Sequence, residues 1–225
     1  AAMAVFGYLY NHRSACWFHA LPLRREALFT TQYLAGLSML LLPQLAASLL
    51  TALVEVSFLE VSHWPKVLGI LLLFVLAQSG VSLFCFSFAA FCAMFTGHIL
   101  ALPVFYGVLN FLVAGIWYMV DLLLREFFYG YAGISNVTNV IQLLTPGVAL
   151  HDAVRVTFHD STSIRSPNTL LLYAIAGVFL FFAALYVYRR RHVETAGYVV
   201  AVAIVRPLFK YGVTLCSGLA LGMFS

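Results

Sequence analysis

Long apolar runs limit what this sequence can fold into more than any other feature does. Four of them cover residues 32–56, 65–95, 99–120 and 168–188, and charged side chains are confined to their ends. A helix of about 20 apolar residues crosses the hydrocarbon core of a bilayer. Charged residues make up 9% of the chain, against roughly 25% in a soluble domain. The sequence therefore predicts an all-α, polytopic bundle of transmembrane helices.

Shorter apolar stretches occur at both ends of the chain. Residues 1–10 are too few to cross a bilayer, and we interpret them as part of a span. Residues 192–225 begin with polar residues and end in an apolar run, which we interpret as a cytoplasmic connector and the start of a further span. We therefore expect a segment of a longer polypeptide, with one helix truncated at each end.

The distribution of charge between the loops predicts the orientation. Segment 11–31, the turn at 96–98 and the region after residue 188 together hold eight basic and two acidic residues, whereas the loops on the other side hold four basic and six acidic residues. Because loops rich in Lys and Arg stay in the cytoplasm, the first set is expected to be cytoplasmic. The stretch 121–167 is then expected outside.

Charged and apolar residues alternate before the first span, in the sequence HALPLRREALF. Pro22 can begin a helix because its missing N–H would be unpaired there in any case. We expect Leu21, Leu28 and Phe29 to face lipid, and the charged residues to face water or a partner. Two interpretations remain open: a positively charged anchor at the lipid headgroups, or a short docking helix through which a cytoplasmic partner pushes on the span. The docking residues would be Leu21, Pro22, Arg24, Arg25, Glu26 and Phe29, with Glu26 bonded to a cation of the partner or capping the helix.

The stretch 121–167 is too apolar to remain disordered in water. Residues 136–144 are amphipathic, and Thr145 and Pro146 fit the N-cap and first position of a second helix. That helix would bring Val148, Asp152 and Arg155 near one another. We therefore predict a hairpin of two short helices that dips into the outer leaflet and covers the exit as a lid. Its candidate residues are Leu143, Leu144, Pro146 and Arg155.

Uncharged polar side chains inside the predicted spans are further functional candidates. They include Gln44, Gln78 and Asn110. These residues either form hydrogen bonds between helices or line a substrate path, and the sequence leaves both interpretations open. No Asp, Glu, Lys or Arg lies near the middle of a span, which argues against a proton-coupled pump.

The sequence lacks the patterns of a metal or catalytic site. Its seven His and four Cys are scattered, without HxxxH, HExxH or CxxC spacing. We therefore predict no metal ligands and no catalytic residues. A GxxxxGK[ST] phosphate-binding loop is also missing, so any ATPase must be on another chain. The few basic residues lie beside the membrane, and no nucleic-acid partner is expected.

The order of these parts resembles that of the permease subunits of ABC-2 (type-2) ABC exporters. Residues 21–37, LPLRREALFTTQYLAGL, are similar to the family's Leu-Pro, basic pair and acidic residue before its third span. Residues 143–155, LLTPGVALHDAVR, are similar to its outer segment before the sixth span. The resemblance implies that 1–191 is an ABC-2-like transmembrane domain lacking its first span, with a coupling segment at 11–31 and an outer hairpin at 121–167. The apolar tail after residue 191 implies more than six spans, as in bacterial multidrug or peptide-antibiotic exporters.

The resemblance also implies a function in transport. The chain would form the membrane path for ATP-driven export of an amphipathic or lipid-like substrate across the bacterial cell membrane. Its expected partners are ABC ATPase subunits, which bind the ATP and Mg, a second permease copy or paralogue, and membrane lipid. No cofactor and no enzymatic activity are expected on this chain. Two alternatives stay open: an intramembrane enzyme using the outer His and Asp residues, and a sensor or structural membrane protein.

Overall fold

Four long helices dominate the structure, a computed structural model that describes residues 1–11, 13–14, 16–17, 24–58, 63–131, 135–153, 156–157, 163–164, 166–190, 210–212, 214 and 217–218. Within these residues, four helices are long and apolar enough to cross a membrane: α3 (Arg25–Phe58), α4 (Trp64–Phe95), α5 (Ala101–Phe127) and α8 (Pro167–Arg190). The prediction of a helical, multi-pass membrane protein is therefore confirmed.

Shorter elements flank these helices. α1 (Ala2–Val5) and the 3-10 helix η1 (Gly7–Tyr10) precede α3, so residues 1–10 form two short turns rather than part of one regular span. α6 (Ser135–Leu144) and α7 (Pro146–Ala153) lie between α5 and α8. Two-residue strands β1 (Val156–Thr157) and β2 (Ser163–Ile164) pair antiparallel, with Val156 opposite Ile164.

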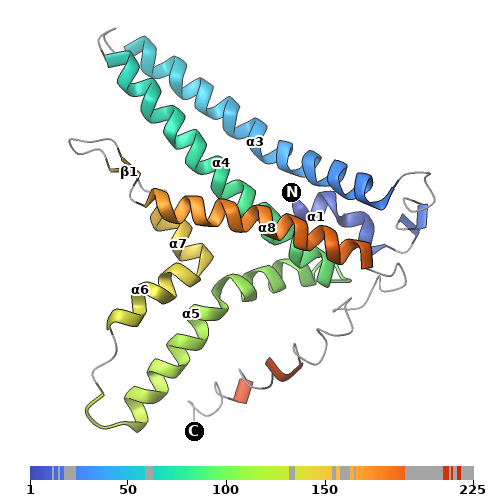
Figure 1. Ribbon diagram of the computed structural model, residues 1–225, viewed down its shortest axis with the longest axis vertical. Helices are drawn as coiled ribbons and strands as arrows, with labels where there is room; N and C mark the ends of the chain where they lie inside the picture. Colours follow the sequence, from blue (N-terminus) through green and yellow to red (C-terminus); the bar gives the residue numbers. More distant parts are fainter. Residues whose placement is uncertain are drawn as a thin grey trace.

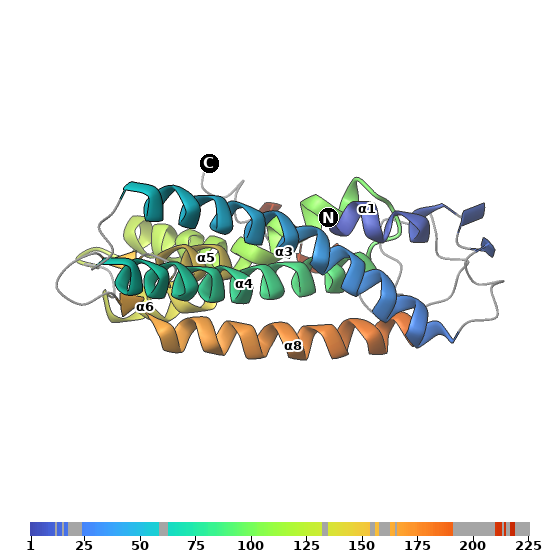
Figure 2. The ribbon, with the colours of Figure 1, turned by 90° about the horizontal axis from the view of Figure 1, so that it is seen from above.

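The long helices are arranged as a fan (Figure 1). They converge at the end where α3 begins and α8 ends. The turn that joins α4 to α5 also lies at this end, and from it these two helices diverge toward the opposite, wide end. We refer to the converged end as the basic end, because Arg24, Arg25, Arg189 and Arg190 lie there. Figure 2 shows α8 and the far half of α3 on opposite sides of α4.

α4 packs more extensively against α8 than against any other helix. The approach is close at Gly177, where a Cβ would lie 3.0 Å from the Cα and 3.2 Å from the N of Phe84. Backbone atoms cannot move aside as the end of a side chain can, so a larger residue would separate the helices. Gly177 therefore allows α4 and α8 to pair.

An aromatic cluster fills the basic end of the bundle. Its rings belong to Phe6, Phe29, Tyr33, Phe86, Phe181 and Tyr188. Phe29 is fully buried, with its ring centroid 5.7 Å from that of Phe6 and 5.3 Å from that of Tyr188. Such separations favour aromatic pairs. The cluster joins the N-terminal segment, α3, α4 and α8 into one block.

The start of α3 differs from the sequence-based expectation. The sequence predicts a surface helix that turns before a span at residue 32, whereas α3 runs unbroken from Arg25. The expectation that Leu28 and Phe29 face lipid is wrong, because these residues are 8% and 0% exposed. The aromatic cluster covers this face of α3 with rings from distant parts of the chain, and local amphipathicity carries no information about those rings.

α5 also extends further than expected, to Phe127 rather than residue 120. Arg125 Nε donates to Asp121 Oδ2 over 2.8 Å, at i, i+4 spacing. A pair of this kind supports a helix outside the hydrocarbon core, where charged side chains are solvated. Both ends of α4, both ends of α8 and the C-terminal end of α3 lie within a few residues of the predicted bounds.

Candidate functional site

α6 and α7 form a helical hairpin in the angle between α5 and α8 (Figure 1). The chain divides between the two helices at Thr145, immediately before Pro146, where the sequence places the junction. Small and apolar residues of α7 pack against α4 and α8 in a core made of Ala77, Phe84, Ala149, Leu150, Ala153, Leu170 and Tyr173. The Tyr173 hydroxyl donates a hydrogen bond to the Leu143 carbonyl near the end of α6. The hairpin is therefore attached to the bundle by both packing and a hydrogen bond.

Thr145 lies at the N-cap position of α7, as expected, but its side chain does not cap the helix. Its Oγ1 donates back to the Ile141 carbonyl over 2.8 Å, as Thr side chains often do within helices. The Thr145 carbonyl accepts the N–H groups of Val148 and Ala149 at 3.1 and 3.0 Å, the bonds expected of an N-cap carbonyl. Thr145 thus bonds to both helices while remaining 1% exposed.

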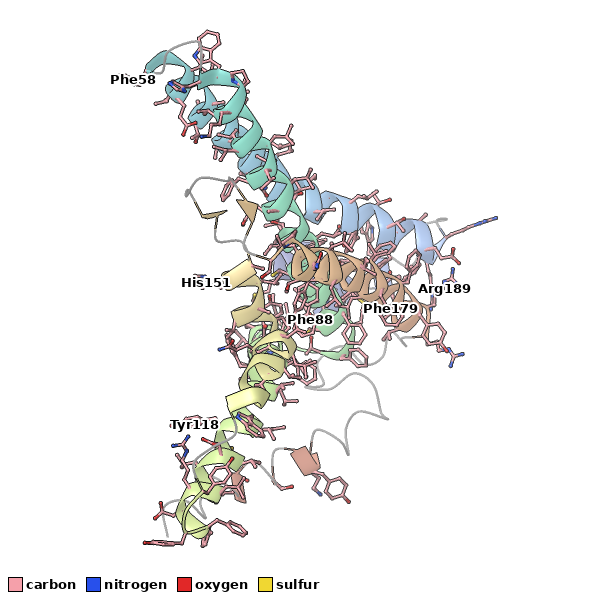
Figure 3. The ribbon with its side chains drawn as sticks, turned by 60° about the vertical axis from the view of Figure 1, so that its left-hand side comes forward. Phe58, Phe88, Tyr118, His151, Phe179 and Arg189 are labelled. Carbon is pink, nitrogen blue, oxygen red and sulfur yellow. The ribbon has the colours of Figure 1, made fainter. Side chains whose placement is uncertain are left out.

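A cavity of about 480 Å³ lies between α4, α5 and the start of α7. Its lining residues are Gln78, Val81, Cys85, Tyr106, Asn110, Pro146, Gly147, Leu150 and His151. The volume falls in the range of small-molecule sites, about 300–1,000 Å³. His151 lies on α7 with its ring pointing away from the neighbouring helices (Figure 3), so it belongs to the rim.

Asn110 is the most enclosed polar residue of the cavity wall, at 8% exposed. Its side chain lies near the Tyr106 hydroxyl, which in turn lies near the Cys85 thiol. Asn110 Oδ1 is buried and has no hydrogen-bond partner in the described part of the chain. The wall thus carries an acceptor without a donor.

Two of the three polar span residues come together here. Gln78 and Asn110 line the same cavity, as the path-lining interpretation requires. Gln44 lies elsewhere and follows the alternative: its Nε2 donates to the Val75 carbonyl over 3.1 Å, joining α3 to α4. A separate hollow of about 260 Å³ beside Gln44 is lined mainly by Leu and Val.

A third hollow, of about 650 Å³, lies between α3, α4 and the first turns of α8. Leu, Gly and Ala residues make up most of its lining, with Ser79 as a polar exception. The Ser79 hydroxyl already donates to the Leu76 carbonyl over 2.8 Å. This hollow therefore offers apolar contact but few groups that could orient a ligand.

The docking residues identified in the sequence lie at the basic end, beside the end of α8. Arg24 and Arg25 are exposed. Glu26 Oε1 forms an ion pair with Arg189 Nη2 over 2.5 Å, and Figure 3 places Arg189 at this end of α8. The cation that pairs with Glu26 therefore belongs to this chain rather than to a partner. Arg190 lies over the Tyr186 ring, 4.6 Å from its centroid. Leu21 and Pro22 lie outside the described residues.

The lid residues are only partly placed by the structure. Leu143 and Leu144 are 43% and 56% exposed, so the hairpin keeps an apolar surface that its own chain does not cover. Pro146 lines the cavity instead. Arg155 and the Asp152 side chain lie outside what the structure describes.

Sequence reasoning missed Cys85, Tyr106 and Gly147 as cavity residues. Cys85 and Tyr106 are ordinary residues of an apolar run, and no local pattern distinguishes their side of the helix. Gly147 follows Pro146 and reads as a helix start. Only the structure shows that Gly147 packs against Asn110 and Phe111 in the cavity wall.

Comparison of this chain with protein-family models, with curated proteins and with solved structures found no match.

Proposed function

We propose that this chain is the membrane-spanning part of an ATP-driven exporter, with its basic end in the cytoplasm. The observation that carries the proposal is the block at that end. The Glu26–Arg189 ion pair and the rings around Phe29 connect the start of α3 to the end of α8. A force applied at Arg24 and Arg25 would therefore move α3, α4 and α8 together.

α5 is the part against which such a block can move. It contacts α4 far less than α8 does and diverges from it toward the wide end (Figure 1). The cavity with Gln78 and Asn110 lies between these two helices, so rocking of the block would change its shape. This supports a path between α4 and α5 whose access responds to events at the basic end.

Exposed apolar surface supports further partners within the membrane. Leu42, Leu72, Phe179 and Leu144 are each more than half exposed, and in a bilayer they contact lipid or a second permease subunit. ATP and Mg would bind the ATPase subunits rather than this chain. The expected substrate is amphipathic or lipid-like.

Association with an ATPase tests the proposal. The chain should co-purify with an ATPase subunit and stimulate its ATP hydrolysis. Arg24→Lys with Arg25→Lys should insert normally yet lose most of that stimulation, because Lys does not reproduce planar bidentate contacts of Arg with carboxylates. An anchor needs only the positive charge and would tolerate the change. Full stimulation by the double variant would return this segment to the anchor interpretation, and the absence of any associated ATPase would overturn the exporter assignment.

An intramembrane enzyme would require titratable groups gathered at one depth. Within the part of the chain that the structure describes, no three His, Cys, Asp or Glu residues lie close enough to hold a metal ion. Of the outer His and Asp residues at 151–152 and 159–160 that this alternative would use, only the His151 side chain lies within the described part of the chain.

A further inference from the structure

The unpaired oxygen of Asn110 is the starting point. A buried acceptor without a donor is destabilising, and the cost is greatest where the surroundings are apolar. Asn110 Oδ1 is the one buried side-chain oxygen or nitrogen in this condition among the described residues. It also belongs to the wall of a cavity large enough for a ligand group. A ligand that supplies the missing donor would remove the cost.

The other groups of the cavity restrict the chemistry of that ligand. The polar wall consists of the Gln78 and Asn110 amides, the Tyr106 hydroxyl and the Cys85 thiol, while the His151 ring lies at the rim and points away from the neighbouring helices. Val81 and Leu150 contribute apolar surface on the remaining sides. No Asp, Glu, Lys or Arg is among the lining residues that the structure describes. A charged group would enter such a site unpaired at membrane depth, where it is costly. The site therefore suits an uncharged polar group.

We propose that this cavity binds the uncharged polar headgroup of an amphipathic molecule, whose O–H or N–H group donates to Asn110 Oδ1. The apolar chain of that molecule remains in the surrounding lipid. As the substrate site of an exporter the proposal rests on the proposed function, whereas as a binding site it rests on the cavity and its unpaired acceptor.

Gly147 controls access to the acceptor. A Cβ on Gly147 would lie 3.5 Å from Asn110 Oδ1 and 3.0 Å from Phe111 Cζ, so the start of α7 covers the oxygen. The ligand donor reaches Oδ1 when this end of the hairpin shifts.

Equilibrium binding to the purified chain in lipid nanodiscs tests the proposal, with radiolabelled 1-monolauroylglycerol as the probe. Unlabelled methyl laurate has the same chain without a donor, and 1-lauroylglycerol 3-phosphate adds a charge. Methyl laurate should compete about tenfold less effectively than unlabelled probe, the effect of one hydrogen bond in an apolar site. The phosphate should compete at least tenfold less effectively, because its charge would enter the site unpaired. Absence of probe binding, or equal competition by methyl laurate, would overturn the proposal and leave the cavity to water or a bare acyl chain.

Asn110→Leu locates the contact. Removing an unpaired buried acceptor should leave the melting temperature unchanged or raise it, while probe binding weakens about tenfold. Thr51→Val is the matched control, because it removes an exposed hydroxyl from α3, outside the cavity. Val81→Phe fills the cavity without altering Asn110 and should abolish binding. Undiminished binding in the Asn110 or Val81 variant would contradict the assignment.

These measurements need neither nucleotide nor ATPase. Loss of ATPase association with intact probe binding would refute the exporter function alone. Normal ATPase stimulation without probe binding would refute the binding site alone.

Discussion

Glu26 in the first turn of α3 and Arg189 in the last turn of α8 form an ion pair at the basic end, with 2.5 Å between Oε1 and Nη2. The side chains of Arg189 and Glu26 are 50% and 55% exposed, and exposed pairs contribute only about 0–1 kcal/mol to stability. Each charge also complements the dipole of its own helix end. The pair therefore contributes more to the relative position of the two helix ends than to the stability of the bundle.

Reversing one charge of this pair should separate coupling from stability. Glu26→Arg places two cations together and is expected to lower ATPase stimulation several-fold, with a change in unfolding free energy of no more than about 1 kcal/mol. The exchange Glu26→Arg with Arg189→Glu should restore most of the stimulation. Glu126→Gln, at the wide end, is the control. A double variant as impaired as the single one would show that the pair has no part in coupling.

Truncation of Phe29 should be far more damaging than truncation of a lipid-facing Phe. Phe29→Ala empties the centre of the aromatic cluster and is expected to cost about 3–5 kcal/mol. Phe179→Ala is the matched control, because Phe179 is 72% exposed on α8. Thermal unfolding of the purified variants measures the difference. Equal losses would place Phe29 at the lipid surface, as the local sequence predicts.

Adding a single methyl group at Gly177 should destabilise the contact between α4 and α8. Gly177→Ala brings a Cβ within 3.0 Å of the Phe84 backbone, and overpacking of this kind costs about 1–3 kcal/mol. Gly115→Ala makes the same substitution in α5, where a Cβ meets nothing within 4 Å. That control should gain up to about 1 kcal/mol from helix propensity. A stability gain in both variants would mean that α4 and α8 lie further apart.

Tyr173→Phe should loosen the hairpin without unfolding the bundle. It removes the donor to the Leu143 carbonyl, and loss of about 1 kcal/mol would speed local hydrogen exchange about fivefold. Exchange mass spectrometry of α6 and α7 reports the change. Tyr118→Phe, on an exposed residue of α5, should leave the pattern unaltered. Unchanged exchange in the Tyr173 variant would mean that packing alone holds the hairpin.

Cysteine labelling checks the orientation predicted from loop charge. In a background without the native cysteines, Tyr129→Cys should react with an impermeant maleimide on intact cells, since Tyr129 is fully exposed beyond α5. Ser14→Cys should react only after the cells are permeabilised, because its segment is expected in the cytoplasm. The reverse pattern would overturn both the orientation and the cytoplasmic docking site.

The sequence by itself determined the properties that depend on neighbouring residues. The apolar length of each span is such a property, and so is the division of the hairpin at Pro146, whose ring and missing N–H suit the first position of a helix. The gathering of Arg24, Arg25, Arg189 and Arg190 at one end follows from the order and length of the spans.

Only the tertiary structure decided which sides of the spans meet. In a soluble helix, polar residues mark the outer face, but in a membrane the lipid-facing and protein-facing sides are both apolar, so Phe29 and Phe179 look alike in sequence. The crossing of α4 with α8, set by the backbone contact at Gly177, and the seating of α7 against α5 bring Gln78, Tyr106 and Asn110 to one cavity. Contacts between residues far apart in the chain depend on how whole helices pack, and no local pattern carries that information.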